Sequence, residues 1–481
     1  MKKIVTAITK CISLVSPRAA QNYLAGHLAL SSFYKAGSLK GPNGGFGLGM
    51  QNKNLAIARE AKIIRQRARL LDNDAPNITG AIRKIINNVI YTGIHLQVQN
   101  AKNEKKEKVI EKKWKSWAKS QKLWLLQRQV LRSIILDGGC FVHFYLGKEN
   151  AVCPLGLELI SIDRLDETIN GKLENGNFAF KGIELDKHKN IVAYHIKEDD
   201  EYAYYMGIHT QFAETKRIGK DNIFLCYLQE DIGQLLPVSW LHSVIMTMHS
   251  FNEYQLTEQI AAQLAASFGI FLKQNSDYMG PNLDGKSLMG GIASDCNLNI
   301  NDFISSGRID VLPAGTEIQV AENNRPSSNY SNYSKQCQKN ASTGIGLSYE
   351  SFSNDFSEAS YSSVRQAILE ERRNYQVIQE MIVRLFLEPV WEKFEETAKL
   401  FGVLPSEEIA VRWQRPGWQW VDPMKDAQAQ KMLYEAKLKS GHMITAEMGY
   451  DYDEVQAQIE KEQASNKTDK SEGANNEPIN K

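Results

Sequence analysis

Three stretches of the chain carry apolar residues at helical spacing, and a region of short apolar runs lies between the first two. The helical stretches cover 55–71, 238–268 and about 362–402, where apolar positions recur at i, i+3 and i+4. At a rise of about 1.5 Å per residue, the middle stretch would be about 46 Å long, more than most globular helices. Residues 155–230 show short apolar runs separated by turn residues such as Asn170-Gly171. This pattern predicts antiparallel strands, and the chain as a whole an α+β fold.

Tryptophans mark one face of a further predicted helix. Trp114, Trp117, Trp124 and Leu131 follow one another at spacings of three and seven residues, which places them on one helical face. We expect them to pack in the core rather than to form a ligand cage. Asp137-Gly138-Gly139 should end this helix, and the CFVHFYL run that follows predicts a strand.

A shorter helix is predicted from about residue 330, with Tyr330, Tyr333, Cys337 and Ala341 on one face and Gly344 at its end. The serine-rich stretch that follows is expected to be a loop.

The long helix that begins near 362 has two irregular positions. Glu371 interrupts its apolar stripe. Pro389 should kink it near Leu385, because the proline ring strikes the carbonyl four residues earlier. Asp422-Pro423 then predicts the start of a C-terminal helix, with Asp as the cap and Pro in the first turn.

Three segments lack the apolar anchors of a packed core. Residues 36–54 are glycine-rich and polar, which is typical of a mobile arm or linker. Residues 269–325 are broken by Gly, Asn and Asp and contain only short strand-like pieces. Residues 464–481 are polar throughout, and we expect them to be disordered.

The opening residues, MKKIVTAITKCISLVS, have some features of a signal peptide. However, Lys10 interrupts the apolar stretch, and Arg18 stands where a small-residue cleavage site should be. Secretion is therefore the less favoured alternative. No segment has the roughly 18 consecutive apolar residues of a membrane span, so we expect a soluble protein that does not enter a membrane.

Charge is almost balanced along the chain. Lys and Arg number 57 against 56 Asp and Glu, for a net charge of +1. A tight sequence-specific DNA binder usually has a strongly basic domain, so this balance argues against one. It remains compatible with a protein that lets DNA slide past. Each lysine–phosphate contact adds affinity for DNA and slows its movement, so a sliding surface needs few of them.

The six cysteines, at positions 11, 140, 153, 226, 296 and 337, are scattered and form no CxxC pair. A zinc site or a disulfide framework is therefore not expected, and a reducing cytoplasm fits best.

Residues 280–287, GPNLDGKS, satisfy the P-loop pattern through Gly280, Gly285, Lys286 and Ser287. A P-loop needs a buried strand before it and a helix that begins at its Lys-Ser. The preceding QNSDYM is polar, and the following SLMGGIASD contains two adjacent glycines. The favoured interpretation is a surface loop that matches by chance, with nucleotide binding as the alternative.

Other candidate chemistry is weaker. His242 and His249 lie seven residues apart on one predicted helix without a metal-binding motif. Asp163, Asp166 and Glu167 follow a predicted strand, but the sequence supplies no partner for them. We therefore expect no catalytic site, no metal site and no cofactor, and a protein that is not an enzyme.

One segment carries a specific resemblance. Residues 344–365, GIGLSYESFSNDFSEASYSSVR, resemble the most recognisable segment of lambda-type phage portal proteins. The family pattern is G-x-G-x-S-Y-E, then D-x-S, then Y-S-S-x-R at the start of a long helix. The matching positions are Gly344, Gly346, Ser348, Tyr349, Glu350, Asp355, Ser357, Tyr361, Ser362, Ser363 and Arg365.

Four further stretches resemble the family in the same order, at 157–166, 181–196, 233–241 and 413–429. The last, WQRPGWQWVDPMKDAQA, is similar to a W-x-x-P-x-W-x-W-V-D-P-x-K-x-A block. The resemblance thus extends from about 60 to 460. The chain departs from it at Leu236-Pro237, where relatives commonly have Arg-Gly, and at Gly139, where many have Glu. The first departure puts an inter-subunit arginine contact at that place in doubt.

The resemblance implies a portal fold with a mixed α/β wing, long stem helices, a small clip insert, a kinked tunnel helix and a helical crown. Its expected parts are an N-terminal arm and linker (1–54), the wing (55–237), the first stem helix (238–268), the clip (269–325), the second stem helix (326–345), the tunnel loop (346–363), the kinked tunnel helix (364–404), a wing return strand (405–421), the crown helices (422–465) and a disordered tail (466–481).

The resemblance also implies a function. The chain would form a homododecameric ring at the unique capsid vertex, for the packaging and ejection of double-stranded DNA. Its expected partners are the terminase large subunit, head-completion or connector proteins, and the major capsid and scaffold proteins. It would be assembled in the host cytoplasm and reside in the virion. A P-loop ATPase such as the packaging motor, and a non-phage ring or scaffold, are the alternatives.

The tunnel loop supplies the candidate site residues. These channel candidates are Ser348, Tyr349, Asp355, Ser357, Glu358, Tyr361, Ser362, Ser363 and Arg365. Serine hydroxyls would offer DNA phosphates weak, exchangeable hydrogen bonds, while Asp355 and Glu358 would repel them. The alternative is that Tyr349 and Tyr361 pack the loop against the wing.

Overall fold

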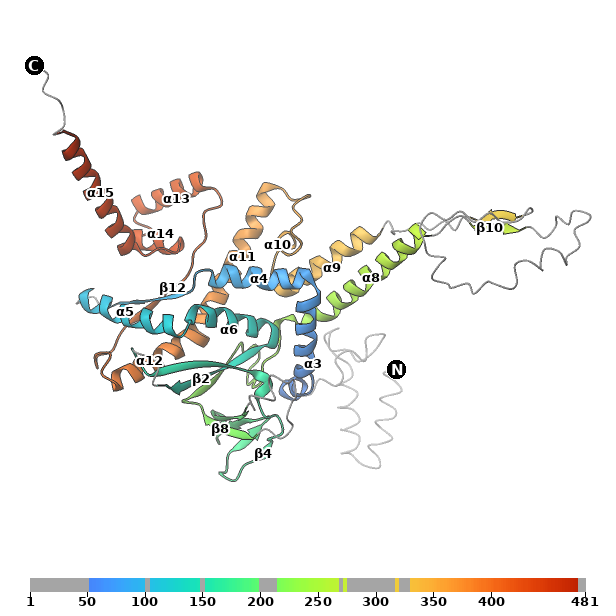
Figure 1. Ribbon diagram of the computed structural model, residues 1–481, viewed down its shortest axis with the longest axis horizontal. Coiled ribbons are helices and arrows are strands. Elements are labelled where there is room, and N and C mark those ends of the chain that lie inside the picture. Colours follow the sequence, from blue (N-terminus) through green and yellow to red (C-terminus); the bar gives the residue numbers. More distant parts are fainter. Residues whose placement is uncertain are drawn as a thin grey trace, which may run out of the picture. The chain divides into compact units, whose positions relative to one another are not determined.

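The computed structural model describes residues 52–99, 104–147, 152–198, 214–267, 271–274, 316–319 and 329–474 (Figure 1). The chain divides into two compact units, Met1–Glu60 and Ala61–Lys481. The first is described only where helix α3 (Lys53–Asp74) begins, and the account below concerns the second. Helices are combined with strands that all pair antiparallel, in agreement with the predicted α+β class. Among the described residues, no helix is long and apolar enough to cross a membrane.

Helix α4 (Pro76–Ile90) is central to the core. Pro76 occupies its first turn, where the missing N–H costs no hydrogen bond. Its apolar residues lie three and four positions apart, so one face of the helix is buried; they are Ile78, Ala81, Ile82, Ile85, Ile86, Val89 and Ile90. This face shares a continuous core with α6 (Leu123–Asp137), α11 (Tyr361–Ile382) and α12 (Glu388–Leu400).

The tryptophan helix is two helices rather than one. α5 (Glu104–Ser120) ends before α6 begins at Leu123, because Lys122 adopts a left-handed conformation with φ 51°. Trp114 and Trp117 are buried, and both pack against Phe394 with ring centroids 5.0 and 4.7 Å away. The turn rotates Trp124 away from this cluster, and its side chain is 49% exposed. Core packing is thus confirmed for two tryptophans, and the prediction is wrong for the third.

Gly138 ends α6 as predicted, with φ 88°. A Cβ at this position would lie 2.6 Å from the backbone of Val238, so the close approach also requires glycine. Strand β2 (Gly139–Leu146) begins at the next residue and lies between β3 (Leu155–Ser161) and β9 (Ile223–Tyr227) in a three-stranded sheet. The turn η2 (Ile162–Arg164) follows β3.

A second, five-stranded sheet has the order β4-β5-β6-β7-β8. Its strands are Gly171–Lys172, Phe178–Phe180, Ile183–Leu185, Ile191–Lys197 and Thr215–Gly219. Asn170-Gly171 does not form the predicted hairpin, because Gly171 is already part of β4. The turn between β4 and β5 contains Gly176 instead, with φ 82°, and its strands are joined where Leu173 N donates to Asn177 O. Asn175-Gly176 satisfies the turn pattern as well as Asn170-Gly171 does, and the pairing of β4 with β5 places the turn at Asn175-Gly176.

The long helix predicted over 238–268 is shorter at its start. A 3₁₀ turn, η3 (Trp240–Ser243), precedes α8 (Ile245–Ser267). Helix α9 (Tyr330–Ile345) packs along α8, where Tyr254 contacts Tyr330 and Tyr333 with centroids 5.8 and 4.9 Å apart. Gly346, with φ 82°, ends α9, rather than Gly344.

Strands β10 (Phe271–Gln274) and β11 (Thr316–Gln319) pair antiparallel within the predicted clip. The rest of 269–325, including the P-loop-like 280–287 and Lys286, lies outside the described residues, as does the predicted N-terminal arm up to residue 51.

The helix predicted to kink is built from three pieces. α11 passes into a π-helical turn, η5 (Val383–Leu387), and then into α12, where Pro389 occupies the first turn. The widened turn contains Leu385, the residue whose carbonyl the proline ring would otherwise strike, so the irregularity lies where it was predicted.

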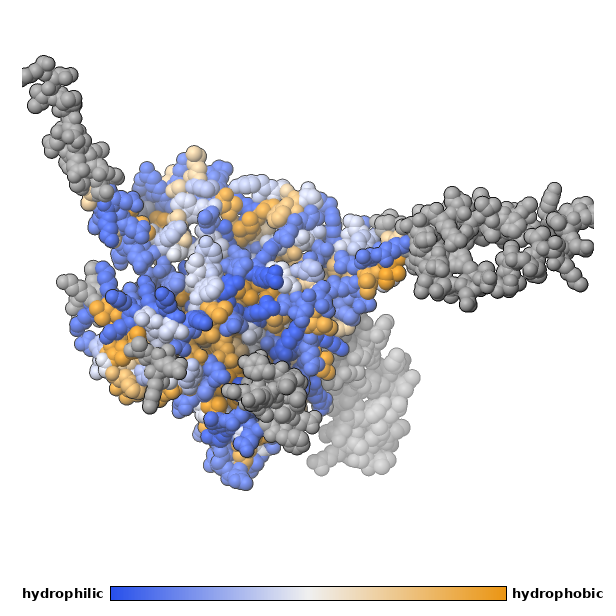
Figure 2. Space-filling view, viewed as in Figure 1, coloured by the Kyte–Doolittle hydropathy of each residue, from blue (hydrophilic) through white to orange (hydrophobic). Residues whose placement is uncertain are grey.

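The C-terminal part begins with β12 (Val411–Gln414), which pairs with β1 (His95–Val98). Asp422 caps α13 (Pro423–Glu435) by accepting from Lys425 N at 3.3 Å, as predicted. α14 (Gly441–Glu447) and α15 (Tyr452–Ala474) follow. Because α15 continues to Ala474, the predicted disordered tail from 466 is wrong for its first residues; the remainder lies outside the described residues. The surface visible in Figure 2 mixes hydrophilic and apolar residues.

Candidate functional site

The segment 346–365 connects α9 to α11 and contains a short helix, α10 (Tyr349–Ser353), where a loop was predicted. Ser348 caps α10 by accepting from Ser351 N at 3.1 Å, and Ser360 caps α11 by accepting from Ser363 N at 3.2 Å. A serine at an N-cap satisfies one of the free amides of the first turn. These hydroxyls therefore order the segment locally, a role that the expected loop did not include.

Glu371 anchors this segment on α11. Its carboxylate is buried and accepts from Ser348 N at 2.7 Å, Ser351 Oγ at 3.0 Å and Tyr375 Oη at 3.3 Å. Burial, together with the charge of Glu371, raises the pKa of Tyr375 well above its ordinary value. The sequence showed Glu371 only as an interruption of an apolar stripe, and a carboxylate at such a position is the signal that could have identified an anchor.

Lys84 on α4 holds the other side of the same segment. Its ammonium donates to Ser351 O and to Asn354 Oδ1. Burial lowers the pKa of Lys84, and the charge of Glu371 opposes that shift. The segment is therefore fixed between two helices that are remote in sequence.

Asp355 organises the turn after α10. Its carboxylate accepts from Ser357 Oγ at 2.6 Å, Ser357 N at 3.1 Å and Tyr349 Oη at 3.2 Å. These hydrogen bonds, those from Ser357 first, lower the pKa of Asp355. Lys335 of α9, whose charge also lowers that pKa, forms an ion pair with Glu358 at 2.6 Å. The negative charge expected to repel DNA is thus partly offset by a lysine.

The remaining candidates lie at the start of α11. Tyr361, Ser362 and Ser363 are exposed, so Tyr361 does not pack the segment against the rest of the chain. Tyr349 is partly buried, and Lys339 lies over its ring with Nζ 5.4 Å from the centroid. Arg365 donates to Asp426 Oδ1 at 3.0 Å and so connects α11 to α13.

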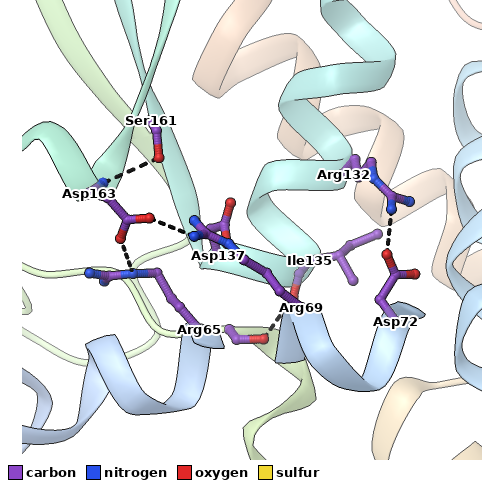
Figure 3. Close-up of polar contacts among 9 residues, drawn as sticks. Arg65, Arg69, Asp72, Arg132, Ile135, Asp137, Ser161 and Asp163 are labelled. Carbon is purple, nitrogen blue, oxygen red and sulfur yellow. Dashed lines mark hydrogen bonds and ion pairs between the residues drawn. The ribbon is translucent and has the colours of Figure 1, made fainter. Parts of the chain in front are cut away.

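The structure also provides the partners that the sequence did not supply for Asp163, the first carboxylate after β3 (Figure 3). Asp163 accepts from Arg65 Nε at 3.0 Å and pairs with Arg69 at 2.6 Å, and Arg69 also contacts Asp137 at 2.7 Å. Burial alone would raise the pKa of Asp163, but the two guanidinium groups lower it below its ordinary value. Arg65 is buried, so this network fixes α3 residues to α6 and the sheet rather than forming a catalytic site.

A second buried carboxylate lies in the five-stranded sheet. Glu184 accepts from Arg217 at 2.7 and 3.0 Å and from the side chains of Asn175 and Asn177 at 2.8 and 2.6 Å. These hydrogen bonds, led by that of Arg217, lower the pKa of Glu184 to about 2. The Glu184 carboxylate is therefore held in its charged form by hydrogen bonds from three side chains, which suits a structural role.

Metal and thiol chemistry has little support in the described part of the chain. No group of three or more His, Cys, Asp or Glu side chains there could hold a metal ion. Four cysteines lie within it, all buried and unpaired by disulfides: Cys140, Cys153, Cys226 and Cys337. Burial raises the pKa of Cys140 to about 12, which keeps the thiol protonated and unreactive at neutral pH.

Comparison with known proteins gives a consistent result. A family described as phage portal protein, lambda family, matches residues 42–379. The probable portal protein of Halomonas phage phiHAP-1 is 28% identical over 430 residues, which cover 84% of this chain and 80% of the relative. The portal protein of Escherichia phage N15 is 22% identical over 307 residues, covering 58% and 57% of the two chains. Among solved structures, a chain in the neck of an empty gene transfer agent particle is 12% identical, with a TM-score of 0.43, over 82% of this chain and 91% of that one.

Proposed function

This chain belongs to the lambda family of phage portal proteins, and we propose that its copies form a closed ring at one capsid vertex, through which double-stranded DNA enters and leaves. The observation that carries the proposal is the extent of the family match, 42–379, which spans the residues predicted to form the wing, the α8–α9 helix pair and the 346–365 segment. The role is that of a structural conduit in the virion.

The α8–α9 pair supports the assignment of a stem. The two helices lie side by side, and the strand pair β10–β11 follows at the end where α8 stops and α9 starts (Figure 1). The chain therefore leaves along one helix and returns along the other. We assign α8 and α9 to the stem and the 269–325 insert to a clip that meets the terminase large subunit during filling and head-completion proteins afterwards. The wing and crown would face the capsid and scaffold proteins.

The dimensions of such a ring suit DNA. Twelve helices with axes about 10 Å apart lie on a circle of roughly 19 Å radius. Subtracting a helix half-width of about 5–6 Å leaves a bore near 27 Å. This opening admits a hydrated duplex without a tight contact, as sliding requires.

We assign the surface that meets DNA to the 346–363 segment. Its exposed groups, among them Ser362 and Ser363, offer hydroxyls rather than a row of cations. Few counterions would be released at each contact, so the DNA would be guided without being held. The lysine–glutamate pair between Lys335 and Glu358 keeps the local charge close to neutral.

The test adds positive charge to this surface. Glu358→Lys combined with Ser362→Lys should leave the ring intact and slow DNA packaging in vitro, most strongly at low salt, where phosphate attraction is least screened. Glu358→Gln with Ser362→Asn is the matched control, because it changes the same positions without adding cations. Packaging rates equal to wild type across a salt series, in intact rings, would show that this segment does not meet DNA.

A further inference from the structure

Helix α13, Pro423–Glu435, buries none of its side chains in this chain. Apolar side chains along it and in the turn after it are mostly exposed: Met424 at 75%, Met432 at 70%, Tyr434 at 55% and Leu438 at 71%. A helix of this length is marginal in water by itself and normally depends on burial of an apolar face. The single chain does not provide that burial.

The contacts that hold α13 in place are polar. Asp426 accepts from Arg365 at 3.0 Å, Gln430 donates to Glu447 at 3.2 Å, and Lys439 in the following turn pairs with Glu447 at 2.6 Å. They orient the helix and leave its apolar side chains in solvent. Large apolar side chains left exposed on a helix that its own chain does not bury indicate an interaction surface.

Charge identifies the kind of partner. Between Pro423 and Lys439, the sequence has four lysines against two acidic residues. Between Tyr452 and Glu462, at the start of α15, it has four acidic residues against one lysine. Glu460 and Glu462 are exposed, and Ile459 between them and the helix start is 39% exposed. Helix α13 itself has two lysines and two acidic residues, so the excess of positive charge lies in the turn after it, at Lys437 and Lys439. The start of α15 is acidic, and both regions expose apolar side chains.

We infer that α13 of one copy, with the turn that follows it, packs against α15 of the next copy in the ring. The inference rests on the proposed ring function and specifies one of its interfaces. Two different surfaces that complement each other form a head-to-tail contact, the type that closes into a ring when the rotation is correct. Met and Tyr would occupy the centre of the contact and the lysine–carboxylate pairs its rim.

Double-stranded DNA is a poorer occupant of the surface formed by α13 and the basic turn after it. Phosphates would leave Met432 and Leu438 without apolar partners. The acidic start of α15 follows α14 in the chain (Figure 1), and Tyr452 of α15 contacts His442 of α14 with ring centroids 4.1 Å apart. That acidic start would repel a duplex that approached α13. A second copy of the chain, unlike DNA, would cover Met432 and Leu438 with a protein surface.

The test exchanges charges between the two surfaces in the full chain. Lys431→Glu with Lys437→Glu makes the α13 side acidic, and Glu460→Lys with Glu462→Lys makes the α15 side basic. Each pair alone should raise the protein concentration needed for half-maximal ring formation by roughly tenfold or more at low salt, measured by mass photometry. The chain carrying all four changes should assemble like wild type, as should an equimolar mixture of the two variants. This rescue also shows that the exposed substitutions do not unfold the protein.

Two further variants make the result specific. Met432→Ser with Leu438→Ser should weaken assembly at every salt concentration, because apolar contacts are not screened. Lys172→Glu with Lys187→Glu, which reverses two exposed lysines on the five-stranded sheet, should leave assembly unchanged.

Wild-type assembly of both charge-reversed variants, or failure of the fourfold variant to recover, would overturn the inference while the ring proposal stands. Intact rings of the Lys431/Lys437 variant with weakened DNA binding would overturn it in favour of a DNA contact. A wild-type chain that never forms rings would overturn the proposed function itself.

Discussion

Replacing Glu371 by alanine should release the 348–353 segment from α11. The substitution removes three hydrogen bonds to one buried carboxylate, from Ser348 N, Ser351 Oγ and Tyr375 Oη. Hydrogen bonds to charged groups contribute about 1.5–3 kcal/mol each, but those that share one acceptor are not additive. Because Ser348 and Ser351 are only partly buried and regain water, whereas Tyr375 is buried, we expect a loss of about 3 kcal/mol for Glu371→Ala. Glu371→Gln keeps one acceptor oxygen and should cost about 1–2 kcal/mol.

The loss of stability should appear first as local opening of the 348–353 segment, before the whole protein unfolds. Amide hydrogen exchange reports the free energy of local opening. At about 1.4 kcal/mol per tenfold change, exchange of the Ser348 amide should accelerate about a hundredfold in Glu371→Ala and about tenfold in Glu371→Gln. Mass spectrometry with fragmentation that resolves single amides measures this directly.

A matched control lies next to the anchor. Glu370 is exposed on the same helix, and Glu370→Ala should leave the exchange of the Ser348 amide unchanged. An unchanged Ser348 amide in Glu371→Ala, or equal acceleration in both variants, would refute the assignment of Glu371 as the anchor.

Three further predictions concern the body of the protein. Asp163→Asn leaves the buried Arg65 without its closest counter-charge and should cost about 1–3 kcal/mol in thermal unfolding, since Asp163 is itself partly exposed. The lowered pKa of Glu184 stabilises the folded state above its unfolded value near 4.3 and loses that contribution as pH falls toward about 2; Glu184→Gln should remove this part of the acid dependence of unfolding. A Cβ at Gly344 would overlap Cγ1 of Val244, so Gly344→Ala should destabilise by about 1–3 kcal/mol, and adding Val244→Ala should restore most of the loss.

Local patterns were sufficient for features that depend on a few neighbouring residues. The end of α6 at Gly138, the cap at Asp422 and the irregular turn before Pro389 were each predicted, because a glycine, an N-cap or a proline acts on its own turn. The short strands from 155 onward were also predicted, because alternating apolar runs reflect burial on one face of a sheet.

Features decided by distant contacts were not predicted. No local signal distinguishes Lys122, which breaks the tryptophan helix, from other lysines in a helical run. The partner of Asp163 is Arg65, 98 residues away. Glu371 reaches back to Ser348 across the turn at 354–360. Within the candidate segment, which residues face one another depends on the packing of α4, α9 and α11, and no local pattern supplies that.

The central claim is that this chain assembles into a closed ring with an opening wide enough for DNA. Cryo-electron microscopy of the purified full-length protein tests it most directly. The expected class averages show closed, rotationally symmetric rings with a central opening near 27 Å, the size expected for about twelve stem helices. Monomers or two-fold dimers at every concentration, or a ring whose opening is too narrow for a duplex, would contradict it.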